Sequence, residues 1–98
     1  MNMLILVTYD VSTESAKGQK RLRKVAKICT RYGLRVQNSV FECNVDISKF
    51  KLLKEELLEI INQKEDSIRF YNLGNKYSNK IEHYGTKAVP DQEDVLII

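Results

Sequence analysis

Asp10 is the first residue of this chain whose type and setting could support chemistry. It directly follows the apolar run Met3–Tyr9, so its carboxylate is expected where a buried strand reaches the edge of its sheet. One carboxylate alone holds Mg²⁺ weakly, because Mg²⁺ prefers several oxygen ligands, but two copies related by a two-fold axis would supply a pair. The alternative is that Asp10 caps the loop Val11–Ser15, as aspartates commonly do. Both interpretations stay open on spacing alone.

A run of cations with helical spacing is the second candidate. From Lys17 to Arg35 the chain has eight basic residues and no acidic one, whereas the rest carries eight basic and thirteen acidic residues. This asymmetry favours a polyanionic partner, with salt-dependent binding that needs no base sequence. The alternative is an ordinary solvated helix face. One face repeats a cation along about 16 Å, through Lys20, Lys24, Lys27 and Arg31.

Four other residues are weaker candidates for chemistry. Phe41, flanked by polar residues on an expected strand, would stack on a base if it were exposed, but the alternative is a place in the core. The one histidine, His83, falls in a polar loop and is expected to be solvent-exposed. Cys29 and Cys43 lie within apolar patterns without C-x-x-C spacing, which predicts reduced core thiols and argues against zinc.

Length and composition limit the class of protein. Ninety-eight residues, 43% hydrophobic and 30% charged, predict one globular domain over 1–98. Its small core favours pairing with a second copy. No stretch approaches the roughly 20 apolar residues that span a bilayer, and Met3–Val7 is too short for a signal-peptide core. We therefore expect a cytoplasmic protein without a membrane partner.

The elements that position these candidates follow from periodicity. The run Met3–Tyr9 predicts a central strand buried on both faces. Helical spacing from about Gly18 to Tyr32 sets an apolar stripe beside the cations, and Gly33 is a suitable stop. Asp46 is placed to cap a second helix, whose buried stripe is predicted to contain Phe50, Leu53, Leu57 and Ile60 or Ile61.

The strand signals complete the predicted fold. Arg35–Val45 has mixed parity, which predicts a bulge near Asn38–Val40, although a hairpin within the segment stays open. Ser67–Leu73 alternates as a strand, Ile81–Tyr84 predicts a short fourth strand, and the tail Val95–Ile98 predicts a strand added to a sheet edge. With helices between strands, this order favours an α+β, ferredoxin-like β-α-β-β-α-β sheet.

Together these residues resemble the second CRISPR-associated protein family. The most specific pieces are the strand end Tyr9-Asp10, the strand Val36–Glu42 and the strand Asp66–Leu73. Lys20–Val25, Tyr32-Gly33, Gly85 and the apolar tail follow in the same order, so the resemblance covers almost the whole chain. It implies a ferredoxin-like fold and a homodimer in which the C-terminal strands are exchanged.

The resemblance also implies a site and an activity. Asp10 from each subunit matches the metal position, with Mg²⁺ as cofactor, and Tyr9, Arg31 and Phe41 match positions associated with nuclease activity. The implied protein is a metal-dependent endonuclease that cuts single-stranded RNA or double-stranded DNA and acts beside the CRISPR integrase in spacer acquisition. In this hypothesis Arg31 stabilises the reacting phosphate, and the strand is held by Lys20, Lys24 and Lys27.

Two other functions remain open at this point. One aspartate per subunit is a sparse site, so the alternative is a non-catalytic, architectural DNA-binding dimer that bridges integrase subunits. A third interpretation, from analogy of fold alone, is an RNA-binding module or a toxin-type ribonuclease.

Overall fold

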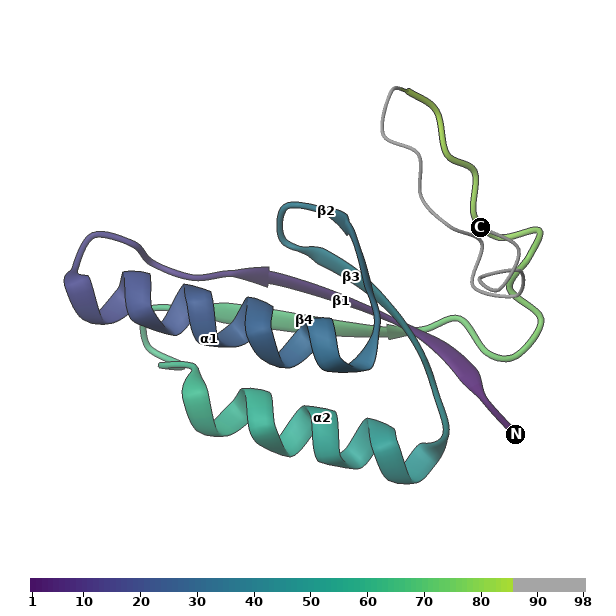
Figure 1. Ribbon diagram of the computed structural model, residues 1–98, viewed down its shortest axis with the longest axis horizontal. Helices are drawn as coiled ribbons and strands as arrows, with labels where there is room; N and C mark the ends of the chain where they lie inside the picture. Colours follow the sequence, from purple (N-terminus) through teal and green to yellow (C-terminus); the bar gives the residue numbers. More distant parts are fainter. Residues whose placement is uncertain (86–98) are drawn as a thin grey trace.

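A four-stranded antiparallel sheet with both helices on one face forms the body of the protein (Figure 1). The computed structural model describes residues 1–85. The strands lie in the order β2-β3-β1-β4. This α+β, ferredoxin-like arrangement confirms the predicted class. Along the chain the elements are β1 (Met3–Asp10), α1 (Ala16–Tyr32), β2 (Leu34–Gln37), β3 (Val40–Val45), α2 (Ile47–Ile60) and β4 (Ser67–Asn72).

The apolar run of β1 forms the centre of the sheet, as predicted. It pairs antiparallel with β3 on one side and with β4 on the other. Alternate side chains face the helices, where Ile5 and Val7 are fully buried against α1 and α2 residues such as Val25 and Leu53. The intervening residues of β1 point to the face that neither helix covers. The strand therefore delivers Asp10, its last residue, to that open face.

Both helices begin at side-chain caps. Ser15 Oγ accepts a hydrogen bond of 3.0 Å from the Gly18 amide, so α1 starts at Ala16, two residues before the predicted start. Asp46 caps α2 as predicted, through a 2.8 Å bond to the Lys49 amide. Gly18 packs closely on the loop after β1, since a Cβ there would lie 1.9 Å from the Ser12 carbonyl oxygen. The first turn of α1 is thus seated on that loop.

The segment predicted as one irregular strand, Arg35–Val45, is a hairpin. Strands β2 and β3 pair antiparallel around the two residues Asn38 and Ser39. The chain reversal explains the mixed parity, so the predicted bulge at Asn38–Val40 is wrong and the alternative of a hairpin is confirmed. The irregularity in the ladder lies between Arg35 and Gln37 instead.

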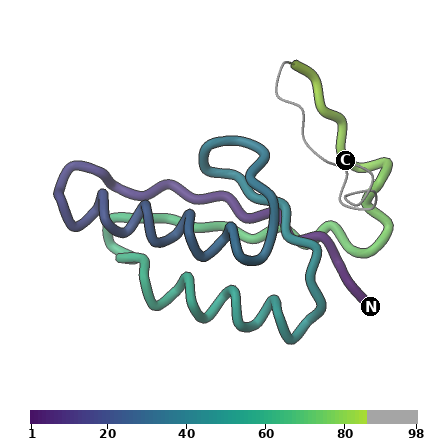
Figure 2. The backbone as a smooth tube through the Cα atoms, in the orientation of Figure 1, coloured from purple at the N-terminus to yellow at the C-terminus, as the bar shows by residue number. Residues whose placement is uncertain are grey.

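The predicted short strand Ile81–Tyr84 is wrong. Those residues form no ladder, because residues after β4 turn back at the start of β1 instead of continuing the sheet. Leu4 exchanges bonds of 2.9 Å with Leu73 and Gly74, and Tyr77 is buried nearby with its hydroxyl 3.0 Å from Asn44 Nδ2. Figure 2 shows this segment leaving the sheet at the end where the chain begins.

The structure also tests several smaller predictions. His83 is exposed, and Cys29 and Cys43 are free and buried, as expected. Burial raises the pKa of each thiol to about 12, so both stay protonated at neutral pH. Among the helices of residues 1–85, none has the length and apolar character to cross a membrane. The tail Val95–Ile98 lies outside the described residues, so its strand stays a prediction, as does the extent of the domain over 1–98.

Candidate active site and nucleic-acid interface

Asp10 is an exposed carboxylate at the end of the central strand. It lies on the open face of the sheet, opposite Ser67 of β4. Within residues 1–85 it accepts no hydrogen bond, and no group of three or more His, Cys, Asp or Glu side chains is placed to hold a metal ion. One protomer therefore supplies a single carboxylate here, whose oxygens are free to bind a hard cation such as Mg²⁺ but cannot complete its coordination.

The loop after Asp10 is capped by a different aspartate. The Ser12 amide donates to Asp66 Oδ1 at 3.0 Å, and the Asn62 amide donates to Asp66 Oδ2 at 2.9 Å. Arg21 of α1 completes the cluster, with Nε 2.8 Å from Oδ2 and Nη2 3.1 Å from Oδ1. The Asp66 side chain has no exposed surface. The interpretation of Asp10 as the cap of its own loop is therefore wrong.

These partners set the ionisation of Asp66. The hydrogen bonds from Arg21, with those from the Asn62 and Ser12 amides, outweigh the opposing effect of desolvation and lower the pKa of Asp66 to about 2. The carboxylate is therefore charged at neutral pH and loses its charge in the folded protein only as the pH falls toward 2. Arg21, whose side chain is only 15% exposed, is committed to this contact and to Glu65.

Tyr9 and Phe41 form one buried aromatic pair on the opposite face from Asp10. Their ring centroids are 6.2 Å apart in a stacked arrangement, and Phe41 is fully buried. The Arg35 guanidinium lies 5.1 Å from the Phe41 centroid and covers it further. A direct contact between Phe41 and a base does not fit this burial, whereas the alternative of a core residue does. Any effect of Phe41 on activity must therefore pass through packing, and that of Tyr9 through packing and through its hydrogen bonds to the β2–β3 turn, where its hydroxyl donates to the Asn38 carbonyl at 3.4 Å.

The cationic stripe predicted on the first helix has two parts. Lys20, Lys24 and Lys27 are exposed, and within the described residues none of them pairs with a carboxylate. Arg31 is 59% exposed and bonds Glu56 of α2 at 2.8 Å. The Tyr32 hydroxyl donates to the same carboxylate, and it lowers the pKa of Glu56 together with Arg31. The lysines are thus the freer part of the stripe.

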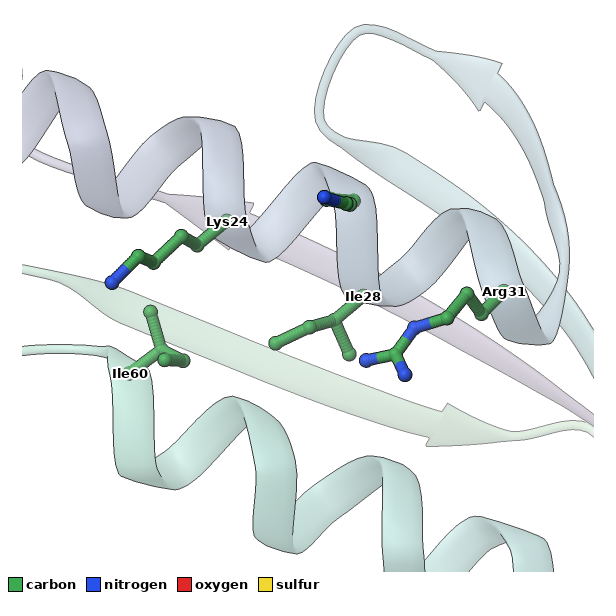
Figure 3. Close-up of a pocket in the computed structure, with 5 residues that line it drawn as sticks. Lys24, Ile28, Arg31 and Ile60 are labelled. Carbon is green, nitrogen blue, oxygen red and sulfur yellow. The ribbon is translucent and has the colours of Figure 1, made fainter.

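Part of the stripe borders a groove between the two helices (Figure 3). The groove has a volume of about 380 Å³ and an apolar floor made by Ile28 of α1 and Ile60 of α2. In Figure 3 the side chains of Lys24 and Arg31 reach from α1 along this groove. The arrangement places positive charge along the helix layer, on the side of the molecule away from the open face of the sheet.

The structure does not bring Arg31 to Asp10 within one protomer. Strand β1 and helix α1 run in opposite directions, and Arg31 lies in the last turn of α1 (Figure 1). At 1.5 Å per residue it is about 22 Å from the helix start, which is the end that adjoins Asp10. Joint action of these two predicted catalytic residues at one phosphate would need Arg31 from another subunit.

Arg69 is a cation that the sequence analysis missed. In the register of β1 and β4, Thr8 faces Arg69 and Asp10 faces Ser67, so Arg69 is a diagonal neighbour of Asp10 on the open face. Its guanidinium bonds the Tyr71 hydroxyl at 2.9 Å. The parity of the strand 67–73 carried the signal, since Ser67, Arg69 and Tyr71 alternate with apolar residues.

The sequence that forms this fold, with its exposed carboxylate at the end of β1 and its lysine-rich first helix, was compared with known protein families. The family described as CRISPR associated protein Cas2 matches residues 3–81. The chain belongs to this family, which confirms the resemblance.

Three similar proteins span the chain. The CRISPR-associated endonuclease Cas2 of Halalkalibacterium halodurans is 58% identical over 95 residues, covering 97% of this chain and 99% of the relative. The CRISPR-associated endoribonuclease Cas2 of Chlorobaculum tepidum is 51% identical over 96 residues, covering 98% and 100%. The crystal structure of Streptococcus pyogenes Cas2 at pH 6.5 is 55% identical, with a TM-score of 0.76 over 85% of this chain and all of the other.

Replacement of Asp66 by Asn is expected to lower the free energy of unfolding at pH 7 by about 2 kcal/mol, the equivalent of its pKa shift. Because the folded-state pKa is lowered, this contribution is present above the unfolded value of 3.8 and is lost as the pH falls toward 2. Urea unfolding of both proteins from pH 7 to pH 2 measures it. The control Glu65→Gln, at a half-exposed ion pair, should change stability by less than about 1 kcal/mol. An equal loss in both variants would contradict the prediction.

Replacement of the three exposed stripe lysines by Ala is expected to weaken single-stranded RNA binding, and to reduce its log–log salt slope by about 2. Fluorescence anisotropy at several salt concentrations measures both quantities. A control with the same loss of charge replaces three exposed lysines outside the stripe and should leave the slope unchanged. The test variant carries Lys20→Ala, Lys24→Ala and Lys27→Ala, and the control carries Lys49→Ala, Lys51→Ala and Lys64→Ala. Equal slopes in the two variants would mean that the stripe is only a solvated face.

Proposed function

We propose that this protein is a Mg²⁺-dependent endonuclease that cuts phosphodiester bonds of single-stranded RNA or double-stranded DNA. The observation that carries the proposal is the Asp10 carboxylate, exposed and without a hydrogen-bond partner among residues 1–85, at the end of a rigid central strand. Its relatives bear the names endonuclease and endoribonuclease. A free carboxylate on a rigid element is what metal-assisted phosphodiester hydrolysis requires.

The site is completed in a homodimer. The open face of the sheet carries apolar side chains that are only partly covered, among them Leu6, Val40 and Tyr71. A second copy on this face would bury them and bring its own Asp10 toward the first, so that one residue supplies two carboxylates. Exchange of the C-terminal strands between subunits is part of this proposal.

Each group of residues has a distinct task in the reaction. The two Asp10 carboxylates hold Mg²⁺, which supplies an activated water and offsets charge on the phosphate when it is bound. Lys20, Lys24 and Lys27 attract and retain the nucleic acid on the helix layer. Tyr9 acts beneath Asp10, since its amide bonds the Ser39 carbonyl at 3.1 Å and ties the end of β1 to the β2–β3 turn. Arg31 contacts phosphate from the far end of α1.

The alternative function is architectural. In it the dimer binds DNA through the lysines of α1, bridges subunits of the CRISPR integrase in spacer acquisition in the cytoplasm, and cuts nothing. The observation that favours it is the distance of about 22 Å between the Arg31 end of α1 and the end beside Asp10. Positive charge is spread along α1 rather than concentrated near the Asp10 carboxylate. Such a distribution suits retention of a long duplex.

Replacement of Asp10 by Asn is expected to reduce cleavage about 100-fold or more, because the amide is neutral and binds Mg²⁺ poorly. Labelled single-stranded RNA and double-stranded DNA, each with Mg²⁺ or with EDTA, report the rate. Glu14→Gln is the matched control, an exposed acid four residues further along, and should cleave at the unmodified rate. Equal cleavage by both variants would refute Asp10 as the metal-binding residue, and equal background in every lane would refute the endonuclease. Integrase-dependent spacer insertion by Asp10→Asn would favour the architectural dimer.

Replacement of Leu6 by Lys is expected to shift the protein from two chains to one at micromolar concentration, because the dimer would have to bury the new charge. Within a protomer the lysine is tolerated, since Glu42 of β3 faces that position. Light scattering after size-exclusion chromatography gives the mass, and circular dichroism checks the fold. Leu58→Lys, on the exposed side of α2, is the control and should remain dimeric. A dimeric Leu6→Lys protein would place the interface elsewhere.

A further inference from the structure

The Asp66 carboxylate joins four segments of the chain around the end of β1. It accepts bonds from the Ser12 amide in the β1–α1 loop, from Arg21 on α1 and from the Asn62 amide just after α2. Asp66 itself leads directly into β4. Its side chain has no exposed surface, so water does not compete for these bonds.

Asp10 lies between two residues that are tied to Asp66, one by a hydrogen bond and one by the chain. Ser12, two residues further along the chain, is bonded to it at 3.0 Å. Ser67, the residue opposite Asp10 in the sheet, is covalently next to Asp66. The Asp66 carboxylate therefore holds the chain two residues after Asp10, and the Asp66 backbone leads into the strand residue opposite Asp10, while the Asp10 carboxylate stays free.

From this geometry we infer that Asp66 is the positioning residue for Asp10: by holding the Ser12 amide it fixes the direction in which the Asp10 carboxylate leaves the end of β1. The inference rests on the proposed function, in which Asp10 binds the metal. A site of this kind needs its ligands held within about 0.5 Å. A misplacement of about 1 Å commonly costs about 100-fold in rate.

Arg21 serves the same cluster and not the nucleic acid. Its planar guanidinium makes two bonds to Asp66, at 2.8 and 3.1 Å, which a lysine ammonium cannot reproduce. A third contact, 3.3 Å to Glu65, lies at the half-exposed edge. This third contact helps to hold Arg21 but does not involve the Ser12 amide, so Glu65 is a natural control for Asp66.

The first experiment measures the anchor directly, by amide hydrogen exchange of the full chain. Asp66→Asn is expected to speed exchange at Ser12 at least about tenfold, while amides in the middle of β1 exchange at their unmodified rate. Glu65→Gln should leave Ser12 unchanged. Arg21→Lys, which keeps the Asp66 carboxylate charged, is the second variant if Asp66→Asn fails to fold, and it should give a smaller increase at Ser12. Unchanged exchange at Ser12 in the folded Asp66→Asn protein, or in Arg21→Lys where Asp66→Asn does not fold, would overturn the inference.

The second experiment asks whether the anchor acts on Asp10. Mn²⁺ should broaden the Asp10 amide resonance of the unmodified protein, and about tenfold more Mn²⁺ should be needed in Asp66→Asn. The Mg²⁺ concentration for half-maximal cleavage should rise by a similar factor, with the Glu65→Gln protein unchanged. A faster Ser12 exchange with no change in the metal requirement would overturn the positioning role and leave the proposed function standing.

The two proposals can fail separately. If the unmodified protein cuts neither RNA nor DNA, yet Mn²⁺ broadens Asp10 in a manner that depends on Asp66, the endonuclease is refuted and the positioning role is supported. If Mn²⁺ does not broaden the Asp10 amide resonance of the unmodified protein, the positioning role is overturned, because Asp10 then binds no metal.

Discussion

A buried carboxylate organises the end of the molecule where the candidate site lies. Removing the charge of Asp66 from water is costly unless it is paired and hydrogen-bonded, so the fold must bring donors to it from several directions. The donors are the Ser12 amide, Arg21 and the Asn62 amide. Through these bonds Asp66 holds the β1–α1 loop, orients α1 and fixes the start of the α2–β4 connection. The close approach of Gly18 to the Ser12 carbonyl depends on the same placement of the loop.

The same contact changes how the basic segment acts. The sequence shows an uninterrupted run of cations, but the fold uses Arg21 internally and pairs Arg31 with Glu56 across the two helices. What remains for a polyanion is a set of exposed lysines together with the exposed Arg23, whose attraction is long-ranged only at low salt. Binding through them is therefore expected to be modest and insensitive to base sequence. Any specificity must come from the site or from partners.

The sequence predicted those parts of this fold that rest on local patterns. The uninterrupted apolar run of β1 and the cap at Asp46 could be predicted because each depends only on neighbouring residues. The hairpin at Asn38-Ser39 was not resolved, since mixed parity fits either a bulge or a reversal. The prediction for Ile81–Tyr84 was wrong because the preceding residues, Leu73 and Gly74, form backbone hydrogen bonds with Leu4. These bonds join residues more than sixty positions apart, so no local pattern predicts them.

The candidate site was likewise predicted only where it depends on local sequence. Asp10 was placed by its position after a strand, which is local information. The roles of Asp66 and Arg21 were not predicted, because a bond between residues 45 apart depends on the packing of α1 against the α2–β4 connection. For Phe41 the error is of the opposite kind, because the resemblance implied a role in nuclease activity that the structure restricts. Phe41 is fully buried, so it can affect activity only through packing. Strand parity was the signal left unused, since it places Arg69 on the same face of its strand as Ser67 and Tyr71.

One surface of the sheet has two requirements that a single copy cannot meet. Its apolar side chains need a cover, and the Asp10 carboxylate on the same face needs further oxygen ligands to hold a hard cation. A two-fold partner on this face answers both at once, because the operation that buries the apolar residues also duplicates the carboxylate. Association and metal binding would then be thermodynamically linked: a metal bound only by the paired site stabilises the dimer, and a weaker interface weakens the metal site. The small size of the core would make such linkage useful, since in the proposed dimer the fold would gain stability from the same partner that completes its metal site.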